Sequence, residues 1–222
     1  MTERPDKRAI ASWAFYDFAN TIFSMNVISL YFALWVTVDH GGQDILYSTA
    51  LSGSMLAVAI SAPVFGTISD QTGRRRFPLT LLTIISVLAT ALIGQADELW
   101  VGLLLFVIAN YCYQSALVFY NGMLPSVARR SNVGMISGYG VALGYIGSIA
   151  GLSLVEPFVT DGDRSAAFLP TAILFLVFAI PCFLFVKDLD PKPFYVDVGQ
   201  SFRILKKTIA NTSDYHVLLK FF

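Results

Sequence analysis

Charged side chains are scarce in this sequence. Aspartate, glutamate, lysine and arginine together make up 14% of its 222 residues, whereas an ordinary soluble domain carries about 25%. Hydrophobic residues make up 55%, and the mean hydropathy is +0.64. These values exclude an ordinary soluble protein, and the formal net charge of zero gives no basis for a nucleic-acid partner. The chain is instead expected to lie mostly within a lipid bilayer.

Histidine and cysteine, which supply many catalytic and metal-binding groups, are also rare. His40 and His216 lie outside the apolar segments, so the intramembrane Ser–His pair of a rhomboid-like protease is missing. Asp17 is the only carboxylate in its apolar run, whereas an aspartyl intramembrane protease needs two, and no H-E-x-x-H zinc motif occurs. Cys112 and Cys182 fall inside apolar segments and are interpreted as small fillers rather than a disulfide. We therefore expect no enzyme activity, no metal site and no cofactor.

Apolar segments free of Asp, Glu, Lys, Arg and His occur six times along the chain. They cover residues 18–38, 45–69, 77–96, 99–128, 131–155 and 165–186. Each is at least 20 residues long, and a helix needs roughly 20 residues to cross the hydrocarbon core. We therefore predict an all-α membrane protein in which residues 1–188 form a bundle of six transmembrane helices.

The basic residues lie on one side of the predicted bundle. Fourteen of the 15 fall in the N-terminal segment, the second loop, the fourth loop and the tail after residue 186, whereas the opposite loops contain only Arg164. Because Lys and Arg concentrate in cytoplasmic loops, both termini are expected to be cytoplasmic. The membrane is expected to be a bacterial cytoplasmic membrane, or a vacuolar membrane if the chain is eukaryotic. Trp13, Trp35 and Trp100 lie near the predicted membrane edges, where amphipathic rings are favoured.

The tail after the sixth segment has a different character. Residues 187–193 are charged and contain two prolines, so the sixth helix is expected to end there. Residues 189–222 are predicted to be a cytoplasmic linker with a basic amphipathic helix, which lies on the membrane surface or is a plain solvated helix. Its apolar face consists of Phe202, Leu205 and Ile209. Because residues 217–222 read as the beginning of an absent seventh span, the chain is interpreted as half of a larger membrane protein or as truncated.

Polar side chains recur on one face of the first segment. Trp13, Asp17, Asn20 and Ser24 follow the spacing i, i+4, i+7 and i+11 of a helical face. Polar groups inside a bilayer are costly and usually face a cavity or another helix, so Asp17 and Asn20, with the neighbouring Tyr16, are predicted to line a path for a solute. The alternative is that Asp17 only marks the membrane interface, since a carboxylate is favoured near a helix N-terminus.

A second polar face is predicted in the fourth segment, where Asn110, Gln114 and Asn121 lie together with Tyr113 beside them. If the helices run antiparallel, Asn121 lies at the depth of Asp17 and Asn110 lies closer to mid-membrane. We predict that these four residues complete the solute path. The alternative is that the amides form hydrogen bonds between helices without touching a solute.

Four glycines form a stripe in the fifth segment. Gly140, Gly144, Gly147 and Gly151 follow the same i, i+4, i+7, i+11 spacing. A glycine stripe lets a neighbouring backbone approach closely, so we predict tight helix packing there. Sliding of the two helices along the stripe is compatible with this packing.

The loop at residues 66–76 has the sequence Gly-Thr-Ile-Ser-Asp-Gln-Thr-Gly-Arg-Arg-Arg. Gly66 is expected to allow close packing and Gly73 to allow a tight reversal with positive φ. Asp70 is expected to pair with a nearby arginine or a helix N-terminus, and the arginines can bind anionic headgroups. We predict a cytoplasmic gate formed by Gly66, Asp70, Gly73, Arg74, Arg75 and Arg76. The alternative is that any short cytoplasmic loop collects arginines.

These motifs resemble a known family. The 66–76 loop resembles the signature between helices two and three of major facilitator transporters. The stretches Trp13-Ala-Phe-Tyr-Asp-Phe-Ala-Asn20, Val118-Phe-Tyr-Asn-Gly-Met-Leu-Pro125 and Ser137-Gly-Tyr-Gly-Val-Ala-Leu-Gly-Tyr-Ile-Gly147 resemble its vacuole-effluxer-like, or unknown major facilitator, subfamily. The fourth segment lacks the arginine of many major facilitator proteins, and the fifth lacks their Gly-Pro pair.

The resemblance implies twelve helices in two halves, each an inverted pair of three-helix repeats, so this chain would be the N-terminal half. It also implies alternating access, with helices one and four lining the cavity, and makes amino acids a plausible substrate class. The expected function is transport of a small polar solute. The expected partners are that solute, the bilayer and a missing C-terminal six-helix half or a second copy. The alternative is a channel or a non-transporting membrane interaction protein made by a half-length chain.

Overall fold

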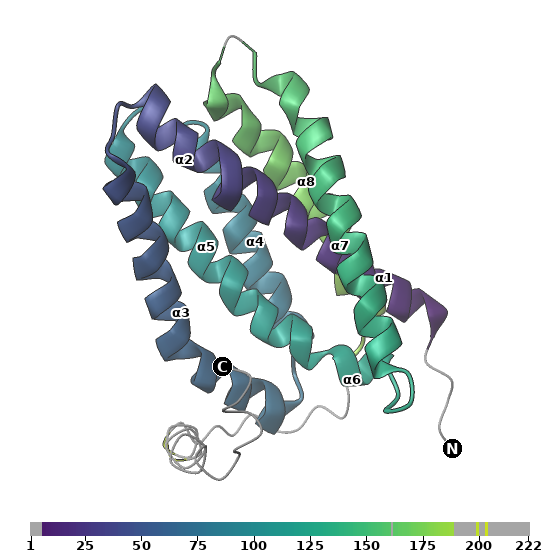
Figure 1. The fold of residues 1–222 in the computed structure, drawn as a ribbon. Helices are drawn as coiled ribbons and strands as arrows, with labels where there is room; N and C mark the ends of the chain where they lie inside the picture. The colour runs from purple at the N-terminus through teal and green to yellow at the C-terminus, as the bar shows by residue number, and fades with distance from the viewer. Residues whose placement is uncertain (1–5, 161, 189–198, 200–202, 204–222) are drawn as a thin grey trace, which may run out of the picture.

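A computed structural model describes residues 6–160, 162–188, 199 and 203 of the chain. Within these ranges the regular structure is all helical, and six helices are long and apolar enough to cross a bilayer (Figure 1). They cover Lys7–Asp39, Asp44–Thr72, Arg76–Ile93, Leu99–Gly122, Val133–Phe158 and Arg164–Phe185. The predicted all-α fold with six membrane helices is confirmed. Of the predicted linker at 189–222, only Gly199 and Arg203 are described, so its amphipathic helix and apolar end lie outside the described residues.

The spans are built from the following elements. The first span joins α1 (Lys7–Phe23), the π-helical η1 (Ser24–Tyr31), α2 (Phe32–Leu34) and the π-helical η2 (Trp35–Asp39). The second and third spans are α3 (Asp44–Thr72) and α4 (Arg76–Ile93). The fourth is α5 (Leu99–Gly122), followed by the short α6 (Leu124–Val127). The fifth joins α7 (Val133–Val155) to the 3-10 turn η3 (Glu156–Phe158), and the sixth joins the 3-10 turn η4 (Arg164–Ala167) to α8 (Phe168–Phe185).

The first helix begins at Lys7, well before the charge-free segment that starts at residue 18. The Asp6 side chain caps it by accepting a hydrogen bond from the backbone N–H of Arg8 at 2.9 Å. Charged residues can occupy the first turns because those turns reach water or headgroups. The charge-free segment is therefore shorter than the helix. Asp17 lies about 15 Å from the start of the helix, beyond the first turn in which the helix dipole favours a carboxylate.

The first three spans (the first span, α3 and α4) form one repeat, and the last three (α5, α7 and α8) form the other. The first helix of each repeat packs mainly on helices of the other repeat. The first span packs on α7 and α8, whereas α5 packs on α3 and α4, and α4 and α8 pack against each other (Figure 1). The first helix of each repeat is therefore held by the second and third helices of the other repeat. Because of this exchange, most of the packing of each first helix comes from the other repeat, and the six helices form one bundle.

Aromatic side chains fill the space between α1 and α5. Trp13 stacks on Tyr120 with ring centroids 4.7 Å apart, Tyr16 stacks on Tyr120 at 4.8 Å, and Phe23 lies 4.5 Å from Tyr113. The Trp13 indole N–H donates to the Tyr120 carbonyl oxygen at 3.3 Å, and the Tyr120 hydroxyl donates to the Trp13 carbonyl oxygen at 3.2 Å. Trp13 is thus buried inside the bundle instead of turning toward the headgroups.

The glycine stripe lies at the contact between α1 and α7. A Cβ added to Gly147 would lie 2.5 Å from the Phe18 carbonyl oxygen, and one added to Gly151 would lie 2.9 Å from Ile22 Cγ1. The Thr21 hydroxyl donates to the Gly144 carbonyl oxygen across this contact at 2.7 Å. The two backbones can approach this closely only because α7 presents no side chains here.

The end of the bundle opposite the 66–76 loop is held by a second cross-contact. Asp39, at the end of the first span, forms an ion pair with Arg164 and also accepts a hydrogen bond from the Arg164 backbone N–H at 3.3 Å. The Trp35 indole N–H donates to the Ser165 hydroxyl at 3.0 Å. Trp35 is fully buried over Gly102, where an added Cβ would lie 2.1 Å from the indole ring. The segment before α8 is thereby tied to the end of the first span.

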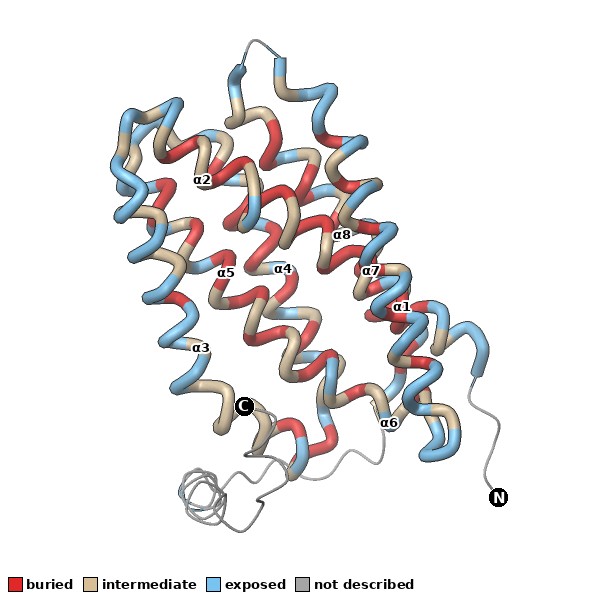
Figure 2. The backbone as a smooth tube through the Cα atoms, in the orientation of Figure 1, coloured by how far each residue is buried: buried red, intermediate tan, exposed pale blue. Residues whose placement is uncertain are grey.

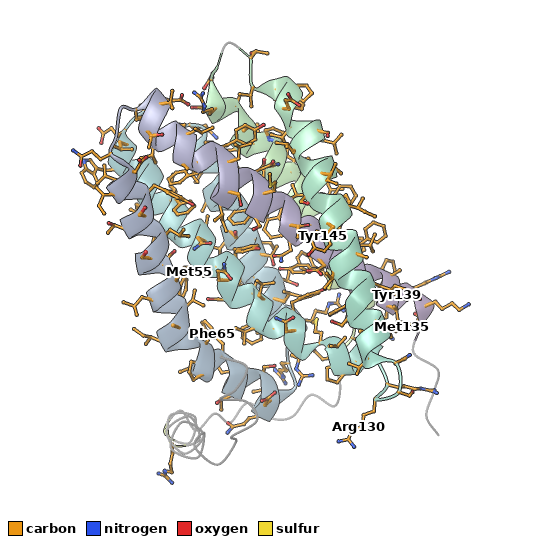
Figure 3. All side chains as sticks on the ribbon, in the orientation of Figure 1. Met55, Phe65, Arg130, Met135, Tyr139 and Tyr145 are labelled. Carbon is orange, nitrogen blue, oxygen red and sulfur yellow. The ribbon has the colours of Figure 1, made fainter. Side chains whose placement is uncertain are left out.

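The helices α3 and α7 flank the bundle and are its most exposed long elements. Figure 2 shows long exposed stretches on both, whereas α1 and α5 are largely buried. Figure 3 shows Met55 on α3 and Tyr139 and Tyr145 on α7, and these side chains are 44%, 54% and 72% exposed. Large apolar side chains on a membrane helix face lipid or other helices, so both flanks are open to such contacts.

The glycine contact gives a stability prediction. Gly147→Ala is expected to lower the thermal unfolding temperature in detergent by several degrees, because its Cβ would press on a backbone oxygen that cannot rotate away; such overpacking costs about 1–3 kcal/mol. The matched control is Gly138→Ala on the same helix, where an added Cβ meets nothing within 4 Å. Equal unfolding temperatures for the two variants would contradict the close-packing interpretation.

Candidate functional site

A pocket of about 360 Å³ lies where the first span meets α7. We call it the α1–α7 pocket. It is lined by Asp17, Thr21, Ser24, Met25, Ser29, Val141, Gly144, Tyr145 and Ser148. From Asp17 to Ser29 it extends roughly 18 Å along the helix axis, which places it around the middle of the first span.

Asp17 is the only ionisable carboxylate or base that lines this pocket. Its side chain is half-buried, and its Oδ2 atom would lie 3.2 Å from a Cβ added to Gly140. The glycine stripe therefore leaves the space that the carboxylate occupies. Within the part of the chain that the structure describes, the Asp17 carboxylate forms no hydrogen bond and no ion pair. Such an unpaired charge within a membrane span usually marks a functional position.

The other predicted path residues of the first span lie beside the pocket and not in its lining. The Tyr16 hydroxyl is 2.8 Å from the Thr83 hydroxyl, and this buried hydrogen bond joins α1 to α4. Asn20 is buried, and its side-chain oxygen has no hydrogen-bond partner in the described ranges. Both residues therefore contribute to the bundle interior behind Asp17.

The predicted residues of the fourth span are spread over different environments. Asn110 is fully buried and donates to the Ser54 hydroxyl at 2.7 Å, which joins α5 to α3. Tyr113 belongs to the aromatic layer, Gln114 is half-buried, and Asn121 is exposed at the end of α5. The Asn110 contact is the kind expected from the alternative in which these amides join helices without touching a solute.

Most hydroxyl groups of the pocket were missed by sequence reasoning. Ser24 is already on the predicted polar face, whereas Thr21 was missed, although it follows Asp17 at i+4 and the same helical spacing predicts it. Ser148 and Tyr145 come from α7, and their approach to Asp17 depends on the packing of two helices more than 100 residues apart. No local pattern in the sequence predicts that contact.

The predicted 66–76 loop is shorter in the structure: residues 66–72 belong to α3 and Arg76 begins α4, because the left-handed Gly73, and not the first polar residue, ends α3. The central arginine of this 66–76 segment is Arg75. Its Nε donates to the Ser69 hydroxyl at 2.9 Å, and its guanidinium lies 3.6 Å from the Asp70 carboxylate. A Cβ added to Gly122 would meet the Arg75 Nε at 3.1 Å, so Arg75 lies across the end of α5. Arg74 is exposed. Asp70 is itself 79% exposed, so its ion pair is worth little, and the packing over Gly122 and the Ser69 bond hold Arg75.

The two loop glycines differ in their surroundings. Gly73 has φ +64° and ends α3, so it adopts the left-handed conformation expected of it. A Cβ added to Gly66 would meet nothing within 4 Å. Any close packing at Gly66 therefore requires a partner other than the described residues.

Asp188 is a contact of this loop that the sequence did not predict. Its Oδ1 atom accepts hydrogen bonds from the backbone N–H groups of Arg75 and Arg76, both at 2.9 Å. These N–H groups stand at the beginning of α4, where a carboxylate satisfies them and interacts favourably with the helix dipole. Asp188, three residues after the end of α8, thus fixes the loop between α3 and α4.

Comparison with known proteins assigns the family. Residues 17–212 match the sequence profile of the Major Facilitator Superfamily. The chain belongs to that superfamily. Membership agrees with the six apolar helices and identifies an integral multi-pass membrane protein. The 66–76 segment, the fourth and fifth spans, and the first span from Asp17 onward lie within the matched range.

Two bacterial proteins are similar to this major facilitator chain over most of its length. An uncharacterized protein of Aquifex aeolicus is 28% identical over 191 residues, covering 85% of this chain and 48% of that protein. An uncharacterized MFS-type transporter of Bacillus subtilis, YxiO, is 28% identical over 235 residues, covering 95% of this chain and 54% of that protein. The chain therefore spans about half the length of both relatives. No solved structure matches.

The Asp188 contact gives a second prediction. Asp188→Ala is expected to lower the free energy of unfolding in detergent by about 1 kcal/mol, the usual loss when a helix loses its capping side chain, and to increase the proteolytic cleavage of the loop after Arg74. The control is Asp97→Ala, since Asp97 is exposed in a loop at the other end of the bundle. Identical cleavage rates in the two variants would show that Asp188 does not fix the loop.

Proposed function

We propose that the chain forms one six-helix half of a secondary transporter that moves a small polar solute across the bilayer by alternating access. The observation that carries this proposal is the α1–α7 pocket, which lies around the middle of the first span and contains the unpaired Asp17 carboxylate at one end. A binding site near the bilayer midplane is the arrangement that alternating access requires. Membership of the Major Facilitator Superfamily and the similarity to an MFS-type transporter support it.

The proposed partner is a C-terminal six-helix half or a second copy of this chain. The chain covers 48% and 54% of its two relatives, which leaves a similar length for a second half. The exposed flanks α3 and α7 are the surfaces proposed to receive it. Gly66 on α3, with open space around it, is the place where a helix of the partner can approach closely.

The proposed orientation places both termini and the 66–76 loop in the cytoplasm. It rests on the basic residues, since the loops on the other side contain only Arg164, and Arg164 is paired with Asp39. The bacterial origin of both relatives supports a bacterial cytoplasmic membrane. The vacuole-effluxer-like subfamily is proposed from the resembling motifs, and it brings amino acids into the range of candidate solutes.

Transport is tested by solute exchange in proteoliposomes. The chain is expected to catalyse saturable counterflow of a labelled solute drawn from mixtures of amino acids and amines. Asp17→Asn is expected to reduce the rate by about tenfold, equivalent to ~1.4 kcal/mol of lost interaction, at unchanged reconstitution. Asp97→Asn serves as the control. Non-saturable flux would indicate a channel and would contradict the proposal. Absence of flux would refute transport by copies of this chain alone and would favour a membrane interaction protein.

The gate is tested by comparing neighbouring arginines. In a background with Cys112 and Cys182 replaced by alanine, a single cysteine at Ser24→Cys reports access to the pocket from either side of the membrane. Arg75→Ala is expected to change the ratio of maleimide labelling from the two sides by about threefold or more, because Arg75 joins α3 to the end of α5. Arg74→Ala, which changes the exposed neighbour within the same predicted gate, is expected to change the ratio less than Arg75→Ala does. Equal ratios in both variants would refute a gating role for Arg75.

A further inference from the structure

We propose that the α1–α7 pocket binds a small organic ammonium ion, a primary amine with an apolar body, in preference to a neutral or zwitterionic analogue of the same size. This inference rests on the proposed function, because it assigns the substrate class of the same pocket. It is narrower than the amino-acid expectation, since an amino acid carries a carboxylate as well as an ammonium group.

The charge of the pocket is the first observation. Asp17 lines it, and none of the other lining residues is basic. The sequence contains no Lys, Arg or His between residues 9 and 38 of the first span or between 133 and 155 of the fifth. Those are the two spans that form the pocket, so neither can supply a counter-ion for Asp17. A bound ammonium group offsets the unfavourable free energy of a lone carboxylate in a membrane span.

The direction of the hydroxyl groups is the second observation. The Thr21 hydroxyl donates its hydrogen to backbone carbonyl oxygens, with Gly144 nearest at 2.7 Å, and the Ser148 hydroxyl donates to the Tyr145 carbonyl oxygen at 2.8 Å. Because each hydroxyl has one hydrogen, these oxygens can only accept further hydrogen bonds. An ammonium group has three donors and no acceptor, so it complements the Asp17 carboxylate and a lining whose hydroxyl oxygens are left as acceptors.

A ligand carboxylate finds no such complement. It needs cations or free N–H and O–H donors, and the hydrogens of Thr21 and Ser148 are already engaged. Ser24 is engaged in a side-chain hydrogen bond with the Tyr113 hydroxyl. Ser29 and Tyr145 add hydroxyl groups to the lining, and neutral hydroxyls suit a neutral group such as a phenol better than they suit a second charge.

The remaining lining sets the size and character of the ligand body. Met25, Val141 and Tyr145 are apolar or aromatic, and the volume of about 360 Å³ lies at the small end of the range of ligand pockets, roughly 300–1,000 Å³. Tyr145 is 72% exposed, and Figure 3 shows it on α7 beside the first span. An aromatic face open to the pocket also favours a cation over a neutral molecule.

The shape of the first span adds a third observation. The π-helical segment η1 begins at Ser24, inside the pocket lining, and continues to Tyr31. Wide turns of this kind are rare and occur most often at functional sites. Just beyond the pocket, Asn26 of η1 donates to the Gly151 carbonyl oxygen at 3.1 Å, which fixes the widened turn against α7.

The test uses three probes of nearly equal shape that differ in charge: tyramine, which carries an ammonium group; its neutral alcohol analogue 4-(2-hydroxyethyl)phenol; and tyrosine, the zwitterion. Binding is measured by titration calorimetry with the purified chain in lipid nanodiscs. Tyramine is expected to bind saturably and about tenfold or more tightly than the other two, which corresponds to at least ~1.4 kcal/mol.

Variants of Asp17 assign the selectivity to the carboxylate. Asp17→Asn is expected to weaken tyramine binding by about tenfold without changing the affinity for the neutral alcohol, whereas Asp17→Glu keeps the preference for tyramine. Asp97→Asn, in an exposed loop, is expected to bind as the unmodified chain does. Thermal unfolding of each variant confirms that the protein is folded.

Three results would overturn the inference: equal affinity for the three probes, tighter binding of tyrosine than of tyramine, or no binding of any probe by a folded protein. The binding assay requires no translocation, so its outcome is separable from that of the transport assay. Selective tyramine binding without flux would refute transport and keep the ammonium site. Saturable tyrosine flux that tyramine does not inhibit would keep transport and refute the ammonium site.

Discussion

The close approach of α1 to α7 is the constraint on which the rest of the structure depends. Gly147 and Gly151 let the two backbones come within contact of each other. That approach places Tyr145 and Ser148 in the same pocket as Asp17 and gives Thr21 a carbonyl partner on the other helix. Larger side chains on the stripe would separate the helices and fill the space around the carboxylate. The glycine stripe therefore determines both the packing and the chemistry of the α1–α7 pocket.

The pocket and the loop show two different uses of charge. Asp17 lies inside a span without a partner in the described part of the chain, so its free energy depends on what occupies the pocket. At the end of the bundle, Arg75 and Asp188 are held by several contacts each, with hydroxyl, carboxylate and backbone groups. The first arrangement suits binding and release, and the second suits a fixed junction.

The spans could be predicted from the sequence because charge in lipid is so unfavourable that its absence marks them. The ends could not, since α1 continues through charged residues to its cap at Asp6. The sequence placed Trp13 near a membrane edge but could not predict its burial against α5, because its stacking partner Tyr120 is more than 100 residues away. Of the seven predicted path residues only Asp17 lines the pocket, because an amide such as Asn110 is engaged by another helix. The role of Asp188 could not be predicted either, because its partners, the backbone N–H groups of Arg75 and Arg76, lie more than 100 residues away on the other repeat.

The cross-contacts between the repeats have a mechanical consequence. Asp188 ties the end of α8 to the beginning of α4, and at the opposite end Arg164 and Ser165 tie the segment before α8 to the first span. Each repeat is thus fastened to the other at both ends, in addition to the exchanged packing between them. A body fastened in this way resists internal shear and tilts as a unit. Large displacements are then left to whatever packs on the exposed outer faces of α3 and α7, and not to the helices inside the bundle.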